Sequence, residues 1–476
     1  MSIPAPKPRL AVVPGAAEEQ EQSLYEVRRK LYPRAVHGWF ARWRWALVVA
    51  TQLAFYGTAW LSWNDRQAVL FDLAARKFYV FGLVFWPQDF IFLTGLLIVS
   101  AFSLFLFTAV AGRLWCGYAC PQTVYTEIFL WIERAIEGDR LARMKLDGQG
   151  VTARKFGKKA LKHAVWIALA LWTGFTFVGY FTPIRTLWGE AWTLTMGPWE
   201  TFWCLFYGFA TYGNAGWMRE QVCKYMCPYA RFQSVMFDPD TLVITYDAQR
   251  GEPRGSRARS ADLAATGLGH CVDCGICVQV CPTGIDIRNG LQYECIGCAA
   301  CIDGCDQVMD KMNYPRGLIR YTTENAVRGR YADRDILRHV LRFRTLLYAA
   351  LLTVIVGVLF TTLVMRSPLK VNVVRDRATL SRDLPDGRTE NVYRLQIMNT
   401  DEVARRYRIS ATGLDGLELV ARQPVEVPPA ASRLVPVELR VNADGLKPGS
   451  HPVVFHVESE QDAHIRRDEK STFIVR

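Results

Sequence analysis

Eight of the thirteen cysteines in this 476-residue chain lie between positions 271 and 305. They form two runs with the spacing C-x2-C-x2-C-x3-C. In this spacing three thiolates bind one cubane iron–sulfur cluster and the fourth binds the other cluster. The alternatives, a zinc site or a disulfide framework, fit two such runs less well. We therefore predict two [4Fe-4S] clusters, the first on Cys271, Cys274, Cys277 and Cys305 and the second on Cys295, Cys298, Cys301 and Cys281.

Four further cysteines form a second thiol constellation. The sequence C-G-Y-A-C-P begins at Cys116 and C-K-Y-M-C-P begins at Cys223, and each follows an apolar segment and an arginine. Soft thiolates select Cu(I), iron–sulfur clusters or zinc. A redox disulfide within each pair, or four buried cysteines that only fill space, are the alternatives. We predict that these thiols converge as a metal or redox site made of Cys116, Cys120, Cys223 and Cys227.

Long apolar segments surround these motifs, and half of the chain is hydrophobic. Each segment is close to the roughly 20 residues that a helix needs to cross a bilayer. A buried helix of a soluble protein could imitate one such segment, but not five. The sequence therefore predicts a polytopic α-helical membrane protein with five spans, Trp45–Trp63, Phe90–Gly112, Ala164–Phe181, Thr201–Trp217 and Leu346–Val364.

The net charge of +12 is distributed between these spans in an alternating way. Residues 1–44, 113–162 and 218–344 carry eight, ten and seventeen Lys or Arg, whereas 64–89 and 182–199 carry three and one. Basic loops stay in the cytoplasm. This explains the charge without nucleic acid, which we do not expect as a partner. We predict a multi-pass protein of the bacterial inner membrane with the N-terminus and clusters in the cytoplasm and the C-terminal domain in the periplasm.

The chain changes character after the fifth span. Short alternating runs such as V-Y-R-L-Q-I and H-P-V-V-F-H-V are separated by turn signals, which predicts an immunoglobulin-like β-sandwich. The predicted domains are a cytoplasmic tail at 1–44, a four-span region at 45–229, an inserted two-cluster ferredoxin-like domain at 230–344, the fifth span at 345–366 and the periplasmic sandwich at 367–476.

Together these features resemble the FixG/RdxA/CcoG family, the accessory proteins for assembly of cbb3-type cytochrome c oxidase. The resemblance covers nearly the whole chain, including both C-x-x-x-C-P motifs, the stretch from Cys271 to Arg288, the segment Gly317–Thr323 and the C-terminal domain. Quinol-dehydrogenase relatives from nitrate-reductase systems share the membrane and ferredoxin parts only. The long C-terminal domain favours the oxidase-assembly family.

The resemblance implies a cupric reductase that converts Cu(II) to Cu(I) for the oxidase, with copper as substrate or bound ion. Copper follows from the resemblance and not from the spacing. The implied partners are the membrane, oxidase assembly factors or a copper chaperone or exporter, and an unidentified cytoplasmic electron donor. Whether the chain forms a homodimer is left open. The alternatives are a quinol dehydrogenase that feeds a periplasmic partner and a non-catalytic assembly scaffold.

Overall fold

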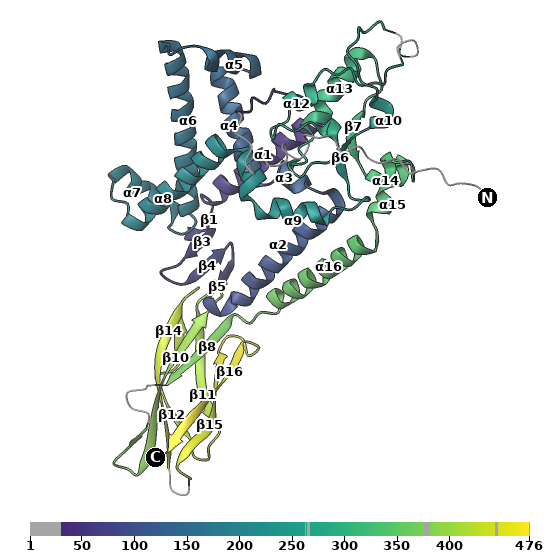
Figure 1. The fold of residues 1–476 in the computed structure, drawn as a ribbon. Coiled ribbons are helices and arrows are strands. Elements are labelled where there is room, and N and C mark those ends of the chain that lie inside the picture. Colours follow the sequence, from purple (N-terminus) through teal and green to yellow (C-terminus); the bar gives the residue numbers. More distant parts are fainter. Residues whose placement is uncertain (1–29, 262, 264–266, 376–380, 443–445, 476) are drawn as a thin grey trace, which may run out of the picture.

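The computed structural model describes residues 30–261, 263, 267–375, 381–442 and 446–475. The cysteine-rich segment lies at one end of an elongated molecule, the β-sandwich lies at the other, and the long helices lie between them (Figure 1). Most of the predicted tail, residues 1–29, lies outside the described residues. Helix α1 (Trp39–Thr58) begins before the predicted Trp45 and ends before the predicted Trp63.

Three helices of the described chain are long and apolar enough to cross a membrane: α2 (Phe90–Ala111) with its preceding turn η2 (Pro87–Asp89), α6 (Ala153–Val178) and α16 (Phe343–Val364). They overlap the second, third and fifth predicted spans, although α6 begins before the predicted Ala164 and ends before the predicted Phe181. Helices α2 and α16 run side by side, apart from the other long helices (Figure 1). The chain is therefore a membrane protein, and the total of five spans stays a prediction.

The fourth predicted span is an irregular helix. Helix α8 (Pro198–Thr211) continues as the π-helix η3 (Tyr212–Met218). It packs closely on α6, because a Cβ atom at Gly174 would lie 2.2 Å from the backbone oxygen of Cys204. Helix α7 (Ile184–Thr193) joins α6 to α8.

The helices around the cysteine motifs are short. They are α3 (Leu114–Tyr118), α4 (Pro121–Glu137), α5 (Arg140–Gly148), η4 (Val222–Met226), α9 (Pro228–Met236), α10 (Ala248–Gly251), α12 (Ile276–Gln279), η5 (Ile287–Asn289), α13 (Ala300–Met312), α14 (Glu324–Val327), η6 (Asp333–Asp335) and α15 (Ile336–Val340). Strands β6 (Val243–Tyr246) and β7 (Ile319–Thr322) pair antiparallel across the cysteine-rich segment.

Five short strands, none of them predicted from the sequence, lie between α1 and α2. They are β1 (Ser62–Trp63), β2 (Arg66–Gln67), β3 (Val69–Asp72), β4 (Lys77–Val80) and β5 (Leu83–Phe85). This small β region contacts the C-terminal sandwich. The Arg66 guanidinium lies 2.6 Å from the Glu402 carboxylate, and Val84 and Trp86 pack on Met398. The sandwich is therefore held against the membrane region by more than its covalent link.

The predicted β-sandwich is confirmed. One sheet has the order β12-β14-β10-β8 with β9 paired to β10, and the other has the order β13-β11-β15-β16. Alternate residues of both sheets form one apolar core, in which Tyr393 and Phe455 make an edge-to-face contact. The strands are β8 (Leu369–Arg375), β9 (Arg382–Asp383), β10 (Arg388–Asn399), β11 (Arg405–Thr412), β12 (Glu418–Val420), β13 (Val425–Val427), β14 (Ser432–Asn442), β15 (Gly449–Ser459) and β16 (Arg466–Val475).

A carboxylate that is distant in sequence caps helix α1. The backbone N–H groups of Phe40 and Ala41 donate to Asp303 at 3.3 and 2.7 Å, and Asp303 lies on α13 between two cluster-motif cysteines. Orphan N–H groups in the first turn of a helix need such acceptors. This explains why α1 begins at Trp39 and how it is joined to the cysteine-rich segment.

We predict that Asp303→Ala loosens this joint. Loss of a capping acceptor costs about 1 kcal/mol, so amide hydrogen exchange at Phe40 and Ala41 should accelerate about fivefold. Asp310→Ala, on an exposed part of the same helix, is the matched control. Equal exchange in both variants would show that the cap does not hold α1.

Candidate functional site

The first predicted cluster set surrounds a small internal cavity. Cys271, Cys274, Cys277 and Cys305 all line it, and Tyr246, Met309 and Leu318 are among the side chains that close it. Cys305 comes from the second run, so the structure brings together the four thiols that the spacing rule assigns to one cluster. Cys274 is exposed, whereas the other three are buried. This set therefore has one solvent-facing side.

The second set lines a neighbouring cavity. Cys281, Cys295, Cys298 and Cys301 are joined there by Cys277 and by apolar side chains that include Ile244, Ile285 and Ile287. Cys281 crosses over from the first run, as the spacing rule requires. Unlike the first set, this one has no fully exposed cysteine.

Both runs use the same backbone turns to direct their thiols. Asp273 and Gly275 flank Cys274 with φ values of 50° and 65°, and Gly297 and Ala299 flank Cys298 with φ values of 68° and 58°. Asp and Ala rarely adopt this left-handed conformation. Its recurrence at equivalent positions in each run indicates that both loops are shaped to wrap a group of similar size.

The chemistry of these cavities fits iron–sulfur clusters. Burial raises the pKa of Cys295 and of Cys305 to about 12 and that of Cys277 to about 11. The metal ligand is the thiolate, so the thiols need nearby positive charge to lose their protons. In the described parts of the chain no three His, Cys, Asp or Glu side chains are gathered closely enough to hold a single ion. Each cavity is instead lined by the four thiols that the spacing rule assigns to one cubane cluster.

The four remaining motif cysteines lie at matching places. Cys116 is in α3 and Cys223 is in η4, whereas Cys120 and Cys227 are extended residues that precede the prolines beginning α4 and α9. Each is partly buried. Burial, followed by the neighbouring Cys120, raises the pKa of Cys116 to about 12, and Cys223 and Cys227 add to this effect. The structure thus brings the four thiols near one another, without gathering three around one ion.

Each motif is braced by the helix that follows the other motif. Arg113, before the first motif, donates to the backbone oxygen of Ala230 on α9. Arg219, before the second motif, forms an ion pair of 2.9 Å with Glu133 on α4. These reciprocal contacts hold the two thiol pairs face to face.

Two glutamines repeat the crossed arrangement. Gln122 on α4 donates to the backbone oxygen of Arg219 at 3.1 Å. Gln233 on α9, which is 1% exposed, accepts from the Cys116 thiol at 3.3 Å and donates to Thr108 at 3.3 Å. The sequence analysis missed both residues. The two glutamines are separated from their motifs by different numbers of residues. A comparison of the two repeats therefore does not reveal them.

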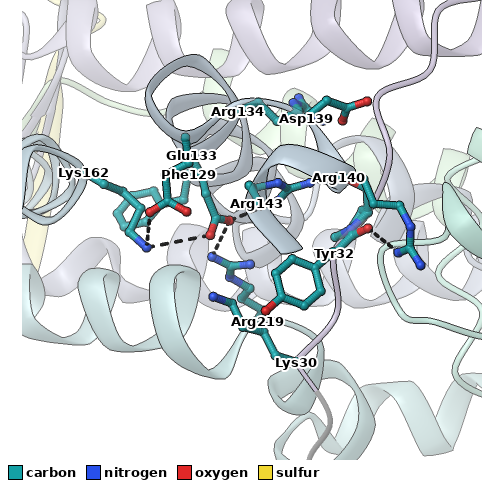
Figure 2. A network of polar contacts seen from close by, with 12 residues as sticks. Lys30, Tyr32, Phe129, Glu133, Arg134, Asp139, Arg140, Arg143, Lys162 and Arg219 are labelled. Carbon is teal, nitrogen blue, oxygen red and sulfur yellow. Dashed lines mark hydrogen bonds and ion pairs between the residues drawn. The ribbon is translucent and has the colours of Figure 1, made fainter. Parts of the chain in front are cut away.

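A buried ionic network supports this arrangement from the far side of α4 (Figure 2). Glu133, which is 1% exposed, receives Arg219, Arg143 and, at 3.7 Å, Lys162. Lys162 also pairs with Glu137 at 3.0 Å. Removing one partner of such a buried set leaves an uncompensated charge, which lowers the free energy of unfolding by about 3–5 kcal/mol. The network therefore fixes α4, α5, α6 and the start of the second motif relative to one another.

The first motif lies directly on the loop of the second cluster set. A Cβ atom at Gly117 would lie 2.6 Å from the backbone oxygen of Gly297 and 2.9 Å from the Cα atom of Cys298. Cys116 and Cys223 pack against the buried group that contains Cys298. Arg113 completes the contact by donating to the backbone oxygen of Tyr293. The second cluster set, not the solvent-facing first one, is therefore next to the four thiols.

We predict that Gly117→Ala separates the two thiol centres. The added methyl group meets backbone that cannot rotate away, and overpacking costs about 1–3 kcal/mol. Alkylation of Cys116 by a bulky maleimide, followed by mass spectrometry, should become several-fold faster. The control is Gly157→Ala on α6, where a Cβ atom meets nothing within 4 Å. Unchanged labelling in Gly117→Ala would contradict the close contact.

Comparison with known proteins gives three domain matches. The family described as 4Fe-4S dicluster domain matches residues 218–324, and the family described as 4Fe-4S binding domain matches residues 93–138. The family described as IG-like fold at the C-terminal of FixG matches residues 359–476. Both iron–sulfur matches include motif cysteines, because the first contains Cys223 and Cys227 and the second contains Cys116 and Cys120.

Similar proteins extend over most of the chain. Protein RdxA of Cereibacter sphaeroides is 41% identical, and the match covers 89% of this chain and 91% of RdxA. Nitrogen fixation protein FixG of Rhizobium meliloti is 42% identical, over 82% of this chain and 80% of FixG. The ferredoxin-type protein NapH of Haemophilus influenzae is more distant, with 23% identity over 46% of this chain and 69% of NapH.

Proposed function

The chain belongs to the FixG/RdxA family and is an iron–sulfur electron-transfer protein, and we propose that it reduces Cu(II) to Cu(I) for assembly of a cbb3-type cytochrome c oxidase. One observation carries the proposal. The C-x-x-x-C-P motifs bring soft thiols against the second cluster set, since Cys116 and Cys223 pack on the buried group that contains Cys298 and Gly117 lies on its loop. Such a site favours the reduced copper ion, and it lies where an electron can reach it.

The eight ferredoxin-type cysteines would hold two [4Fe-4S] clusters, in the two sets that line the two cavities. When bound, the clusters supply one-electron transfer. The surroundings of the two cysteine sets differ, so electrons would enter at the first set and leave from the second. Cys274 gives the first set an exposed side that a cytoplasmic electron donor can approach. Apolar side chains close the second set against water.

Copper is the substrate in this proposal. Each Cu(II) ion takes up one electron, which the cytoplasmic donor supplies, and becomes Cu(I). Thiols of Cys116, Cys120, Cys223 and Cys227 would lose their protons to solvent as they bind the ion, and binding would draw them closer than they lie in the free protein. Gln233 holds the Cys116 thiol at 3.3 Å and thereby orients it. The buried Arg113 guanidinium supplies a positive charge near the thiolates.

From the alternating basic segments we infer that the clusters lie in the cytoplasm and the sandwich in the periplasm of a bacterial inner membrane. The positions of these parts at opposite ends of the molecule support this orientation (Figure 1). In it, Cu(I) forms at the cytoplasmic edge of the helices. The sandwich is then free to dock an oxidase assembly factor or a copper chaperone or exporter on the other side.

The first test is the metal content of the purified chain. We predict iron and acid-labile sulfide near eight each per chain, on the basis of eight ligands in two sets. A content near twelve would show that the C-x-x-x-C-P thiols also hold a cluster and would move the copper site elsewhere. A protein reconstituted without oxygen that holds only zinc would contradict the iron–sulfur assignment.

The second test is turnover with copper. Anaerobic, dithionite-reduced protein, freed of excess reductant, should be reoxidised by Cu(II) and yield Cu(I) that a chelator captures. Cys116→Ser and Cys223→Ser should keep their iron and lose at least tenfold in Cu(I) yield. The control is Cys204→Ala, because Cys204 is buried on α8 beside Val178 and Leu187 and belongs to neither motif.

Three other outcomes separate the alternatives. Reoxidation by a quinone analogue but not by Cu(II) would favour the quinol dehydrogenase. Reoxidation by neither acceptor would favour an assembly scaffold. Full Cu(I) yield from the quadruple cysteine variant would place copper outside these thiols.

A further inference from the structure

An arginine-rich cavity of about 850 Å³ lies beside the second cluster loop. Residues 33–45 form one wall, helix α4 forms another, and Val280, Pro282 and Ala300 form the wall toward the second cluster set. We call it the arginine pocket, after the four arginines that line it, Arg34, Arg42, Arg44 and Arg134. It does not contain the copper-site thiols, and neither predicted cluster set lines it.

Within the residues that the structure describes, arginines outnumber carboxylates in the arginine pocket, where Glu127 is the acidic lining residue. Arg134 pairs with Glu127 at 3.1 Å. Among the described residues, Arg34, Arg42 and Arg44 form no ion pair within 4 Å, and His37 lies beside them. Guanidinium groups without a close ion-pair partner attract an anion, and their fork of N–H groups suits phosphate oxygens.

Arg44 is the second observation that points to a ligand. It is 7% exposed, and it donates to the backbone oxygen of Cys298 at 3.2 Å. Its Nε–H group has no hydrogen-bond partner. A buried donor without an acceptor is costly and calls for an explanation. An anionic oxygen bound to the part of this guanidinium that lines the arginine pocket would offset that cost electrostatically.

The wall of the arginine pocket is fixed before any ligand arrives. Asp139 accepts from the backbone N–H of Ala35 at 3.1 Å, and Arg140 donates to the backbone oxygen of Tyr32 at 2.7 Å. The backbone N–H of Arg34 donates to the oxygen of Gln279 at 2.8 Å. These contacts preorganise the segment, which lowers the ordering cost of binding.

The surroundings identify the source of the anion. Trp45 and Trp131 line the arginine pocket with their rings 6.3 Å apart, and Trp39, Trp43 and Trp131 are each more than half exposed. Tryptophans gather in this way at the level of lipid headgroups. The pocket is on the side of the molecule with the basic loops, where the leaflet is rich in anionic lipid.

We propose that the arginine pocket binds the phosphate group of an anionic phospholipid, with its acyl chains along Trp45 and Trp131. The ligand would lie against the second cluster loop, and Arg44 would join its phosphate to the carbonyl of Cys298. This site does not depend on copper chemistry. The electrostatic potential at the second cluster would then depend on how much anionic lipid the membrane contains.

The test titrates the purified full-length protein, in a neutral detergent, with dioctanoyl phosphatidylglycerol. Native mass spectrometry should show one saturable adduct. Dioctanoyl phosphatidylcholine should bind at least tenfold more weakly. The double variant Arg34→Ala/Arg42→Ala should weaken the adduct about fivefold for each arginine. Both side chains are exposed, so the variant should fold, and its iron content checks that it does.

The matched control is Arg328→Ala/Arg334→Ala, which removes the same charge from exposed positions far along the chain. It should bind phosphatidylglycerol like the unchanged protein. Equal binding of both lipids, or equal weakening by both double variants, would overturn the proposal. Displacement of the lipid by millimolar inorganic phosphate would also overturn its lipid part and assign the arginine pocket to a soluble phosphate compound.

Discussion

The contact of Gly117 with the backbone of Gly297 and Cys298 is the constraint on which the rest of the site depends. Two peptide segments can approach this closely only where no side chain intervenes. The contact joins a membrane-edge thiol motif to a cluster-binding loop that lies about 180 residues further along the chain. Two further contacts reinforce the joint between the cysteine-rich segment and the helices. Asp303 anchors α1 to the cysteine-rich segment, and Arg113 reaches from the first motif to the cluster loop.

The buried charges around Glu133 are explained by the same constraint. Burying ions is expensive, and apolar residues of similar size often give equal or greater stability. Here the charged groups come from different helices, so their pairing fixes one relative position of those helices. An apolar interface would tolerate small shifts, whereas a shift that separates Arg219 from Glu133 takes the buried guanidinium away from its carboxylate. We infer that the network contributes positional accuracy to the thiol site.

The sequence was informative where the chemistry fixes the spacing of residues. Both cluster sets follow from one spacing rule, and the second, third and fifth spans follow from apolar length. Contacts between distant segments gave no such signal. The cap on α1 comes from Asp303, and the β1–β5 region consists of strands too short to show alternation. Arg44 looked like one of many basic residues that flank a span, and only the structure shows that it is buried.

The two thiol motifs are alike in sequence but cannot exchange roles. The position of Gly117 in the first motif is occupied by Lys224 in the second. A lysine could not enter a contact in which even a Cβ atom would lie 2.6 Å from a backbone oxygen.

The two motifs also differ in backbone conformation, since the first is in the α-helix α3 and the second is in the π-helix η4. Only the first motif can therefore make this backbone contact with the cluster loop. The second motif meets the buried group around Cys298 through the side chain of Cys223, and the crossed contacts of Arg113, Gln122 and Gln233 hold it against the first motif. The two motifs thus meet the second cluster set in different ways, one through its backbone and the other through a thiol side chain.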